Sequence, residues 1–157
     1  LFDLIYLPKE NINRVFGEND PDTEALRYAA EIKKFVPINR ESPQFDLMIL
    51  GLGEDGHTAS IFPDQLQLLS SKNICEVAVH PESKQKRITL TGQVINNASE
   101  IDFLITGKSK QNIVHEIFYG KDNLKYPAVH IKTKTGNMNY FLDQDAAGLI
   151  QHPERSL

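Results

Sequence analysis

The chain has 157 residues, of which 40% are hydrophobic and 24% charged, a composition that fits one compact domain with a substantial core. Its net charge of −4 argues against a broad nucleic-acid surface, and no apolar run reaches the roughly 18 residues of a membrane span. The single cysteine, Cys75, excludes a disulfide framework and is interpreted as a core thiol. No secretory signal opens the sequence, and together these features favour the cytoplasm.

The first third of the chain predicts one helix and one buried strand. Asp20 or Asp22 is placed to cap a helix over Thr23–Val36, and Pro37–Pro43 has the composition of a linker. Phe45–Leu50 is an almost continuous apolar run, which predicts a strand covered on both faces. The apolar stripe of the helix consists of Ala25, Leu26, Ala29, Ile32, Phe35 and Val36.

The rest of the chain alternates between strand and helix patterns. Pro63 prevents a long helix after the glycine loop that follows the first strand. This alternation predicts one three-layer α/β domain over residues 1–157, with a mostly parallel sheet. The strands are expected at Ile74–His80, Arg87–Thr91, Ile101–Thr106 and Asn139–Leu142, and the helices at Val94–Ala98, Lys110–Phe118 and Asp143–Ile150.

The glycine loop Gly51–Gly56 fits the G-x-G-x-x-G pattern of dinucleotide-binding sites. Two features oppose that interpretation. Glu54 and Asp55 would place carboxylates beside a pyrophosphate, and Pro63 would interrupt the helix whose N-terminus should hold it. A dinucleotide is therefore not expected, although the loop lies where open α/β sheets bind their ligands.

His57, at the end of this loop, is the candidate catalytic residue. An imidazole titrates near neutrality and can take a proton from a water that attacks a carbonyl, and Asp55 is placed to orient it. The alternatives are a solvent-facing loop histidine or a metal ligand, but the chain has no H-E-x-x-H motif and no cysteine pair. The remaining histidines are interpreted as surface or structural: His80, His115, His130 and His152.

Two groups of cations stand near the ends of predicted strands. Arg87 follows Lys84 and Lys86, and Lys108 and Lys110 follow the strand that ends at Thr106. If both strands run parallel to Phe45–Leu50, these cations converge on the face that holds His57 and form an anion site suited to a phosphate. The alternative is a solvated run of surface charge.

These segments resemble the 6-phosphogluconolactonases, which form a larger group with the glucosamine-6-phosphate deaminases. Phe45–Pro63, with Gly-Leu-Gly-Glu-Asp-Gly-His-Thr-Ala-Ser at its centre, is similar to the family signature. The other similar segments are Pro8–Arg14, Arg87–Thr91, Ile105–Lys110, Tyr126–Ala128 and Phe141–Ala147.

The resemblance implies a Rossmann-like sheet and the hydrolysis of 6-phospho-D-glucono-1,5-lactone, a small phosphorylated sugar lactone. By similarity His57 is the base and Asp55 its support, while Arg87 and Lys110 bind the phosphate. Gly53, Gly56 and Thr58 are expected to contact the substrate. The resemblance implies no cofactor and no metal, and nucleic-acid and membrane partners are not expected.

Two further functions remain open from the sequence. The deaminases carry a glutamate shortly after the histidine, where this chain has Thr58-Ala59-Ser60-Ile61-Phe62-Pro63, so a deaminase is the less favoured alternative. The family also opens with βα units, including a glycine- and serine-rich phosphate loop, that have no counterpart here. We therefore expect the C-terminal portion of a longer fold, for which a non-catalytic sugar-phosphate-binding or interaction fragment is the second alternative.

Overall fold

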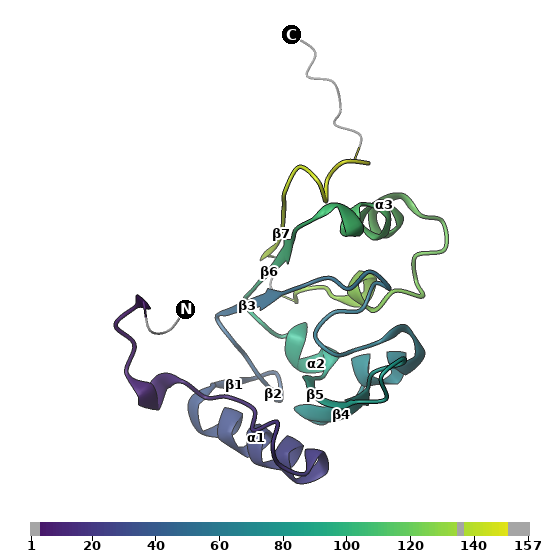
Figure 1. Cartoon of the computed structure of the whole chain (residues 1–157). Coiled ribbons are helices and arrows are strands. Elements are labelled where there is room, and N and C mark those ends of the chain that lie inside the picture. The colour runs from purple at the N-terminus through teal and green to yellow at the C-terminus, as the bar shows by residue number, and fades with distance from the viewer. Residues whose placement is uncertain (1–3, 135–136, 151–157) are drawn as a thin grey trace.

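The central element is a parallel sheet built from the most apolar segments of the chain. A computed structural model describes residues 4–134 and 137–150. Three parallel strands lie in the order β3 (Leu47–Leu50), β6 (Glu100–Ile105) and β7 (Asn137–Leu142), as Figure 1 shows. The predicted α/β class with a parallel sheet is confirmed.

The register of this sheet brings three chain segments to one edge. Leu50 at the end of β3 pairs with Phe103 of β6, and Ile105 at the end of β6 pairs with Leu142 of β7. Parallel strands all end toward the same edge of their sheet, so the glycine loop, the Thr106–Gly107 turn and Asp143 leave it side by side.

Arg87 belongs to a second sheet, which corrects the expectation that its strand runs parallel to β3. Strands β4 (Cys75–Val79) and β5 (Lys86–Leu90) form an antiparallel hairpin. A short turn joins them, closed by the His80 N–H donating to the Gln85 carbonyl at 2.9 Å. A connection this short permits only antiparallel pairing, because parallel strands need a crossover of a dozen or more residues.

The main core lies between the parallel sheet and its helices. Helix α3 (Gln111–Tyr119) buries Ile113, Val114 and Ile117, and the short α2 (Gly92–Ile95) buries Val94 and Ile95. After the glycine loop the chain forms only a 3₁₀ segment, Pro63–Leu69, as expected from the proline. The largest apolar side chains with at most 1% exposure are Phe62, Phe103, Ile61, Ile95, Ile101 and Ile131.

The predicted linker Pro37–Pro43 contains a small hairpin of β1 (Ile38–Asn39) and β2 (Ser42–Pro43). Asn97, 1% exposed, holds it by donating its side-chain amide to the carbonyl oxygens of Asn39, Ser42 and Pro43 at 2.9 to 3.1 Å. A long-range side-chain contact stabilises this hairpin, which explains why local sequence does not reveal it.

Several apolar side chains are more exposed than the sequence predicted. Strand β3 is covered on one face only, since Leu47 and Ile49 are 48% and 60% exposed while Met48 and Leu50 are buried. Helix α1 (Pro21–Phe35) buries Ala25 and Ile32 but leaves the other apolar positions of its stripe less covered. Other large apolar side chains exposed by more than 40% include Leu26 and Phe35 of α1, Leu104 of β6, Phe118 of α3 and Phe141 of β7.

The helix predicted over Asp143–Ile150 is wrong. This segment forms consecutive turns. The Ala147 N–H donates to the Asp143 carbonyl four residues earlier, as in an α-helix, but the Ile150 N–H donates to the Ala147 carbonyl only three residues earlier. Hydrogen bonds between residues three apart are of the 3₁₀ type, which is tighter than the α-helix and rarely extends beyond one turn.

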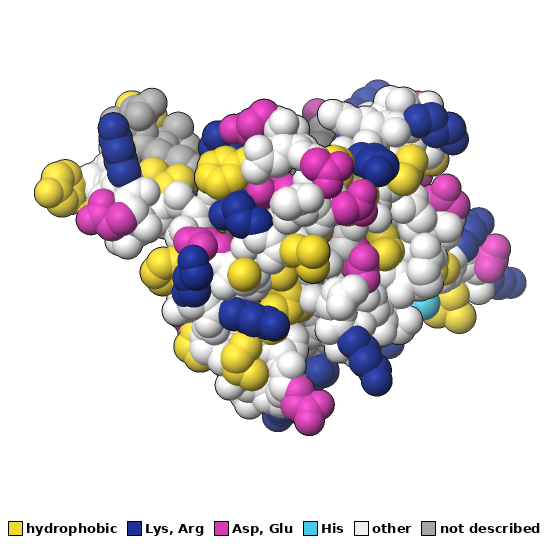
Figure 2. Space-filling view, turned by 90° about the horizontal axis from the view of Figure 1, so that it is seen from below, with side chains coloured by type: hydrophobic (Ala, Val, Ile, Leu, Met, Phe, Trp, Pro, Cys, Tyr) yellow, Lys and Arg dark blue, Asp and Glu magenta, His cyan; other side chains and the backbone are white. Residues whose placement is uncertain are grey.

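The exposed face below the sheet carries mixed charge. Figure 2 shows basic, acidic and hydrophobic side chains interspersed over this face, with no single basic patch. Within residues 4–134 and 137–150, no helix is long and apolar enough to cross a membrane.

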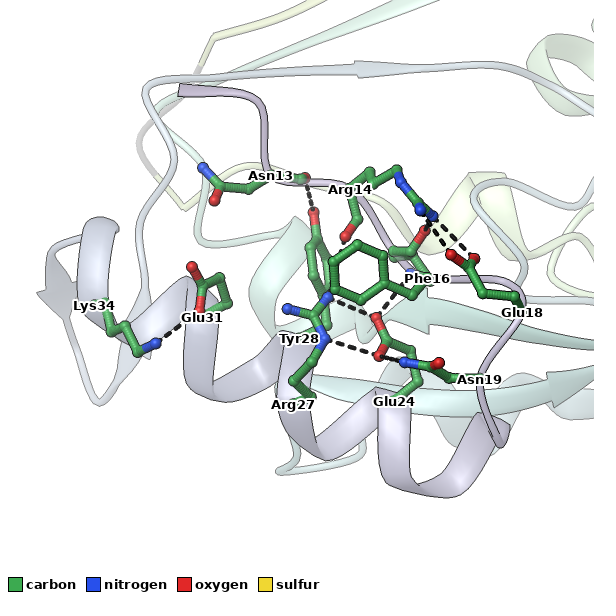
Figure 3. Close-up of polar contacts among 11 residues, drawn as sticks. Asn13, Arg14, Phe16, Glu18, Asn19, Glu24, Arg27, Tyr28, Glu31 and Lys34 are labelled. Carbon is green, nitrogen blue, oxygen red and sulfur yellow. Dashed lines mark hydrogen bonds and ion pairs between the residues drawn. The ribbon is translucent and has the colours of Figure 1, made fainter. Parts of the chain in front are cut away.

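Helix α1 is fastened to the N-terminal segment by one buried carboxylate (Figure 3). Glu24 is fully buried and accepts hydrogen bonds from the Phe16 N–H (2.8 Å), the Asn19 amide (3.0 Å) and Arg27 (2.6 and 2.8 Å). The guanidinium groups of Arg14 and Arg27 lie 4.4 and 4.1 Å from the centroid of the Phe16 ring. The hydrogen bond from Arg27 is the main reason that the pKa of Glu24 falls to about 2.

This depressed pKa predicts a specific loss of stability in acid. A carboxyl group with a lower pKa in the folded than in the unfolded chain stabilises the fold fully above its ordinary pKa of 4.5. Its contribution then declines as the pH falls from 4.5 toward 2. We expect Glu24→Gln to destabilise the protein at pH 6, and the difference from wild type to shrink steadily below pH 4.5 in urea unfolding followed by circular dichroism.

Glu31→Gln is the matched control, because Glu31 pairs on the same helix with the solvent-exposed Lys34 at 2.8 Å. It should leave the unfolding midpoint nearly unchanged at pH 6. If the stabilities of wild type and Glu24→Gln changed in parallel with pH, the stabilising role of the ionised Glu24 carboxylate would be wrong.

Candidate active site

The glycine loop is a closed structure held mainly by its own backbone. The Gly53 N–H donates to the His57 carbonyl at 2.8 Å, and the Gly56 N–H donates to the Gly53 carbonyl at 3.0 Å. The Thr58 hydroxyl donates to the Gly51 carbonyl at 2.9 Å and closes the base of the loop. These bonds fix the position of His57 relative to the end of β3.

His57 and Asp55 form the polar centre of the loop. The His57 Nδ1 lies 2.6 Å from the Asp55 Oδ1, and the same oxygen accepts the His57 backbone N–H at 3.1 Å. An ionised carboxylate only accepts hydrogen bonds, so this contact favours the neutral tautomer with its proton on Nδ1, in which Nε2 keeps a free lone pair. The side chain of His57 is 24% exposed, which leaves it within reach of a small molecule.

Gly53 is the residue that makes this arrangement possible. A Cβ atom at position 53 would lie 2.1 Å from the His57 Nδ1 and 2.6 Å from the Asp55 Oδ1. Real Cβ contacts are never this short, so no other residue fits while the imidazole and carboxylate hold their places.

A cavity of about 450 Å³ opens beside the imidazole at the end of the sheet. It combines an apolar wall from β3 with the loop and one cation from the Gly107 segment. Because β6 is parallel to β3, the Gly107 segment reaches the same edge as His57, as predicted. Its lining includes Gly51, Gly53, His57, Ala59, Leu90 and Lys110.

Arg87 lies near His57 but belongs to β5 of the antiparallel hairpin. It lines an adjacent cavity of about 330 Å³ that it shares with Ser60. Its guanidinium carbon lies 5.8 Å from the centroid of the Phe62 ring, and the His57 ring lies 4.8 Å from that ring on a tilted plane. The fully buried Phe62 therefore contacts both the imidazole and Arg87.

Burial separates two of the predicted cations from the others. Within the part of the chain that the structure describes, only Arg27, Arg87 and Lys110 are half-buried among lysines and arginines. Arg27 pairs with Glu24, whereas no ion pair with a described residue engages Arg87 or Lys110. Arg87 and Lys110 are therefore two half-buried cations without an ion-pair partner among the described residues, and each lines a different cavity.

The other predicted cations point elsewhere. Lys84 donates to the Pro81 carbonyl at 2.6 Å, and Lys86 pairs with Asp22 of α1 at 3.4 Å. Lys108 is exposed.

The other histidines have local contacts of their own. His80 Nδ1 accepts two backbone N–H groups of its turn, His115 packs on Tyr119, and His130 contacts the Leu124 carbonyl at 2.6 Å. His152 lies outside the described residues.

Two of the residues expected to contact the substrate also contact other parts of the protein. Thr58 is completely buried and its hydroxyl is engaged with Gly51, as described above. Gly56 has φ of 80° and packs against Tyr126, where a Cβ would lie 2.5 Å from the ring. Both residues stabilise the conformation of the glycine loop through these contacts.

Three residues that hold the segments of the candidate site in place were not predicted from the sequence. Phe62 joins His57 to Arg87, and Thr89 of β5 accepts the Ser60 N–H at 3.1 Å, which ties the loop to the second sheet. Asp143 binds the Gly107 turn with both carboxylate oxygens. No local pattern signals these roles, because each depends on a partner distant in the sequence or on packing.

Other chemistries find less support at this site. No α-helix follows the glycine loop, so the helix N-terminus of a dinucleotide site is missing from the described structure. Burial raises the pKa of the Cys75 thiol to about 12, which makes it a poor nucleophile. No group of three His, Cys, Asp or Glu side chains among the described residues is placed to share a cation.

Comparison with known proteins assigns the family. The sequence model of the glucosamine-6-phosphate isomerases/6-phosphogluconolactonase family matches residues 1–140, and the chain belongs to this family. It is similar to 6-phosphogluconolactonases of Haemophilus influenzae (44% identity over 151 residues) and Aggregatibacter actinomycetemcomitans (43% over 151). Each match covers 96% of this chain and 63% of the relative, so the chain spans less than two thirds of their length.

A solved structure named devB protein has the same fold. It superposes with a TM-score of 0.90 at 41% sequence identity, covering 96% of this chain and 63% of the other. The Rossmann-like α/β architecture is therefore that of the family.

The geometry around Gly53 gives a direct test. We expect Gly53→Ala to displace the imidazole and break the Nδ1 hydrogen bond to Asp55. The measurement is the imidazole nitrogen NMR spectrum, in which the His57 resonances should shift while those of His115 stay in place.

Gly51→Ala is the matched control, because a Cβ at position 51 meets no atom within 4 Å. It should leave the His57 resonances unchanged. Equal effects of the two substitutions would show that His57 does not depend on the space at Gly53.

Proposed function

We propose that the protein hydrolyses 6-phospho-D-glucono-1,5-lactone to 6-phospho-D-gluconate, a step of the oxidative pentose phosphate pathway. One observation carries the proposal: an imidazole held by Asp55 lines a cavity together with the half-buried Lys110, and it packs on the same Phe62 ring as the half-buried Arg87. The names of the relatives in the family support the same substrate. We further propose a cytoplasmic location and catalysis without a cofactor or metal.

In the proposed mechanism His57 acts as a general base. Its free Nε2 takes a proton from a water molecule, and the water oxygen attacks C1 of the lactone. The bond between C1 and the ring oxygen then breaks, and the ring oxygen takes the proton back from the imidazolium. Asp55 holds the ring orientation and stabilises the positive charge that His57 carries between these steps.

Arg87 and Lys110 are proposed to bind the 6-phosphate. Arg87 offers a planar fork that can bind two phosphate oxygens, and Lys110 offers a point charge from the segment that follows β6. A phosphate held by both groups places the rest of the sugar over the loop, within reach of the imidazole. Gly53 takes part by keeping His57 in place, and we propose indirect roles for Gly56 and Thr58.

Two other functions are less well supported. A deaminase needs a second acid near the histidine, but Ser60-Ile61-Phe62-Pro63 supplies no carboxylate there, and Ile61 and Phe62 are fully buried. A non-catalytic sugar-phosphate-binding domain would use the cations but would not need an oriented imidazole. Ammonia release from glucosamine 6-phosphate, or binding of 6-phosphogluconate without turnover, would favour these alternatives.

The role of His57 is tested by His57→Ala in the natural full-length protein. General-base catalysis typically contributes about 10²- to 10⁴-fold, so kcat for freshly generated lactone should fall by that factor. Acid release, corrected for spontaneous hydrolysis, measures the rate. His115→Ala, on the surface of α3, should keep wild-type kcat; retained activity in His57→Ala would overturn the proposed base.

The phosphate site is tested by Arg87→Ala and Lys110→Ala. A hydrogen bond to a charged group contributes about 1.5–3 kcal/mol, so each variant should raise KM about 10- to 150-fold. Lys84→Ala is the control, since Lys84 contacts only its own turn, and its KM should stay within about twofold of wild type. Unchanged KM values in the first two variants would place the phosphate elsewhere.

A further inference from the structure

Asp143 connects the ends of two neighbouring strands. It is the first residue after β7, and its carboxylate accepts the Gly107 N–H at 2.9 and 3.1 Å and the Ala146 N–H at 2.8 Å. Its own N–H donates to the Ile105 carbonyl, the last of β6, at 3.3 Å. One exposed side chain thus fixes the point at which the chain turns away from β6.

The residue that Asp143 holds has a special backbone. Gly107 has φ of 95° and ψ of 149°, a region that essentially only glycine occupies. A Cβ there would meet no neighbouring atom, so the restriction comes from the backbone itself and not from crowding. The bond to Asp143 stabilises a conformation that a free loop would leave easily.

Gly107 in turn holds Lys110. The Gly107 carbonyl accepts the Lys110 N–H at 3.0 Å, which closes the 3₁₀ turn Lys108–Lys110. The side chain of Lys110 lines the cavity that contains His57, whereas Asp143 is not part of that lining. A continuous path runs from the carboxylate through both backbone groups of Gly107 to the half-buried cation.

We infer that Asp143 is a positioning residue for Lys110: it presents this cation to the anionic group of the substrate without contacting the substrate itself. The inference rests on the proposed function, because it assigns a purpose to the cation of that site. Fixing the backbone from which this side chain leaves reduces the number of positions that its ammonium group samples, and therefore the entropy lost when the phosphate arrives.

The test is a double-substitution cycle in the natural full-length protein. Asp143→Ala should raise KM for the lactone about five- to tenfold, the scale of ordering one flexible side chain, while kcat stays within about twofold. In a Lys110→Ala background the same substitution should change KM no further, because the cation it positions is gone. Asp143→Asn keeps one acceptor oxygen and should lie between wild type and Asp143→Ala.

Asp145→Ala is the matched control, since the carboxylate of Asp145 makes no hydrogen bond or ion pair with any residue described and lies two residues away. It should leave KM unchanged. Equal increases in KM with and without Lys110, or a loss of kcat and thermal stability at constant KM, would overturn the inference and show a structural role only.

A binding measurement separates this inference from the proposed reaction. If the wild type binds 6-phosphogluconate in calorimetry without lactone turnover, the reaction is wrong, and the same cycle in Kd still decides the role of Asp143. If the protein turns over the lactone but the effects of Asp143→Ala and Lys110→Ala on KM are additive, the role of Asp143 is wrong and the proposed reaction stands. Absence of both turnover and binding overturns both.

Discussion

The parallel pairing of β3 with β6 is the constraint on which the candidate site depends. It sets Leu50 opposite Phe103, so that the glycine loop and the Gly107 turn leave the sheet at one edge. An antiparallel pairing would send the two segments to opposite edges, and His57 and Lys110 would lie a strand length apart. The chemistry proposed for the protein therefore follows from strand direction before any side chain is considered.

Backbone hydrogen bonds hold most of the polar part of the site in place. Gly53 bonds to both His57 and Gly56, Thr58 closes the loop on Gly51, and Asp143 holds Gly107. Backbone groups have fixed positions once the sheet forms, so they can place an imidazole and a cation with little residual freedom. Glycine is required at Gly53 because of the imidazole, and at Gly107 because of its φ angle.

The sequence was sufficient for the features that depend on local pattern. Apolar runs located β3 and β6, and the loop motif identified His57 and Asp55 as neighbours. Features that depend on distant partners could not be predicted from the sequence. The turn after β4 makes Arg87 part of an antiparallel hairpin. The carboxylate of Asp143 binds a backbone N–H that lies 36 residues earlier in the chain. The same limit explains the exposed Ile49, since an apolar run cannot reveal which face of a strand is covered.

The electrostatics of the site are local. The chain carries a net charge of −4, which taken alone would repel a phosphorylated ligand. Interactions between exposed charges are largely screened beyond about 8 Å at physiological ionic strength, so the distant carboxylates count little at the cavity. Arg87 and Lys110 are half-buried and form no ion pair with a described residue, and the apolar ring of Phe62 contacts both Arg87 and the imidazole. Limited solvent access strengthens their attraction for an anion, and in the proposed reaction His57 acts on a substrate already held by its phosphate.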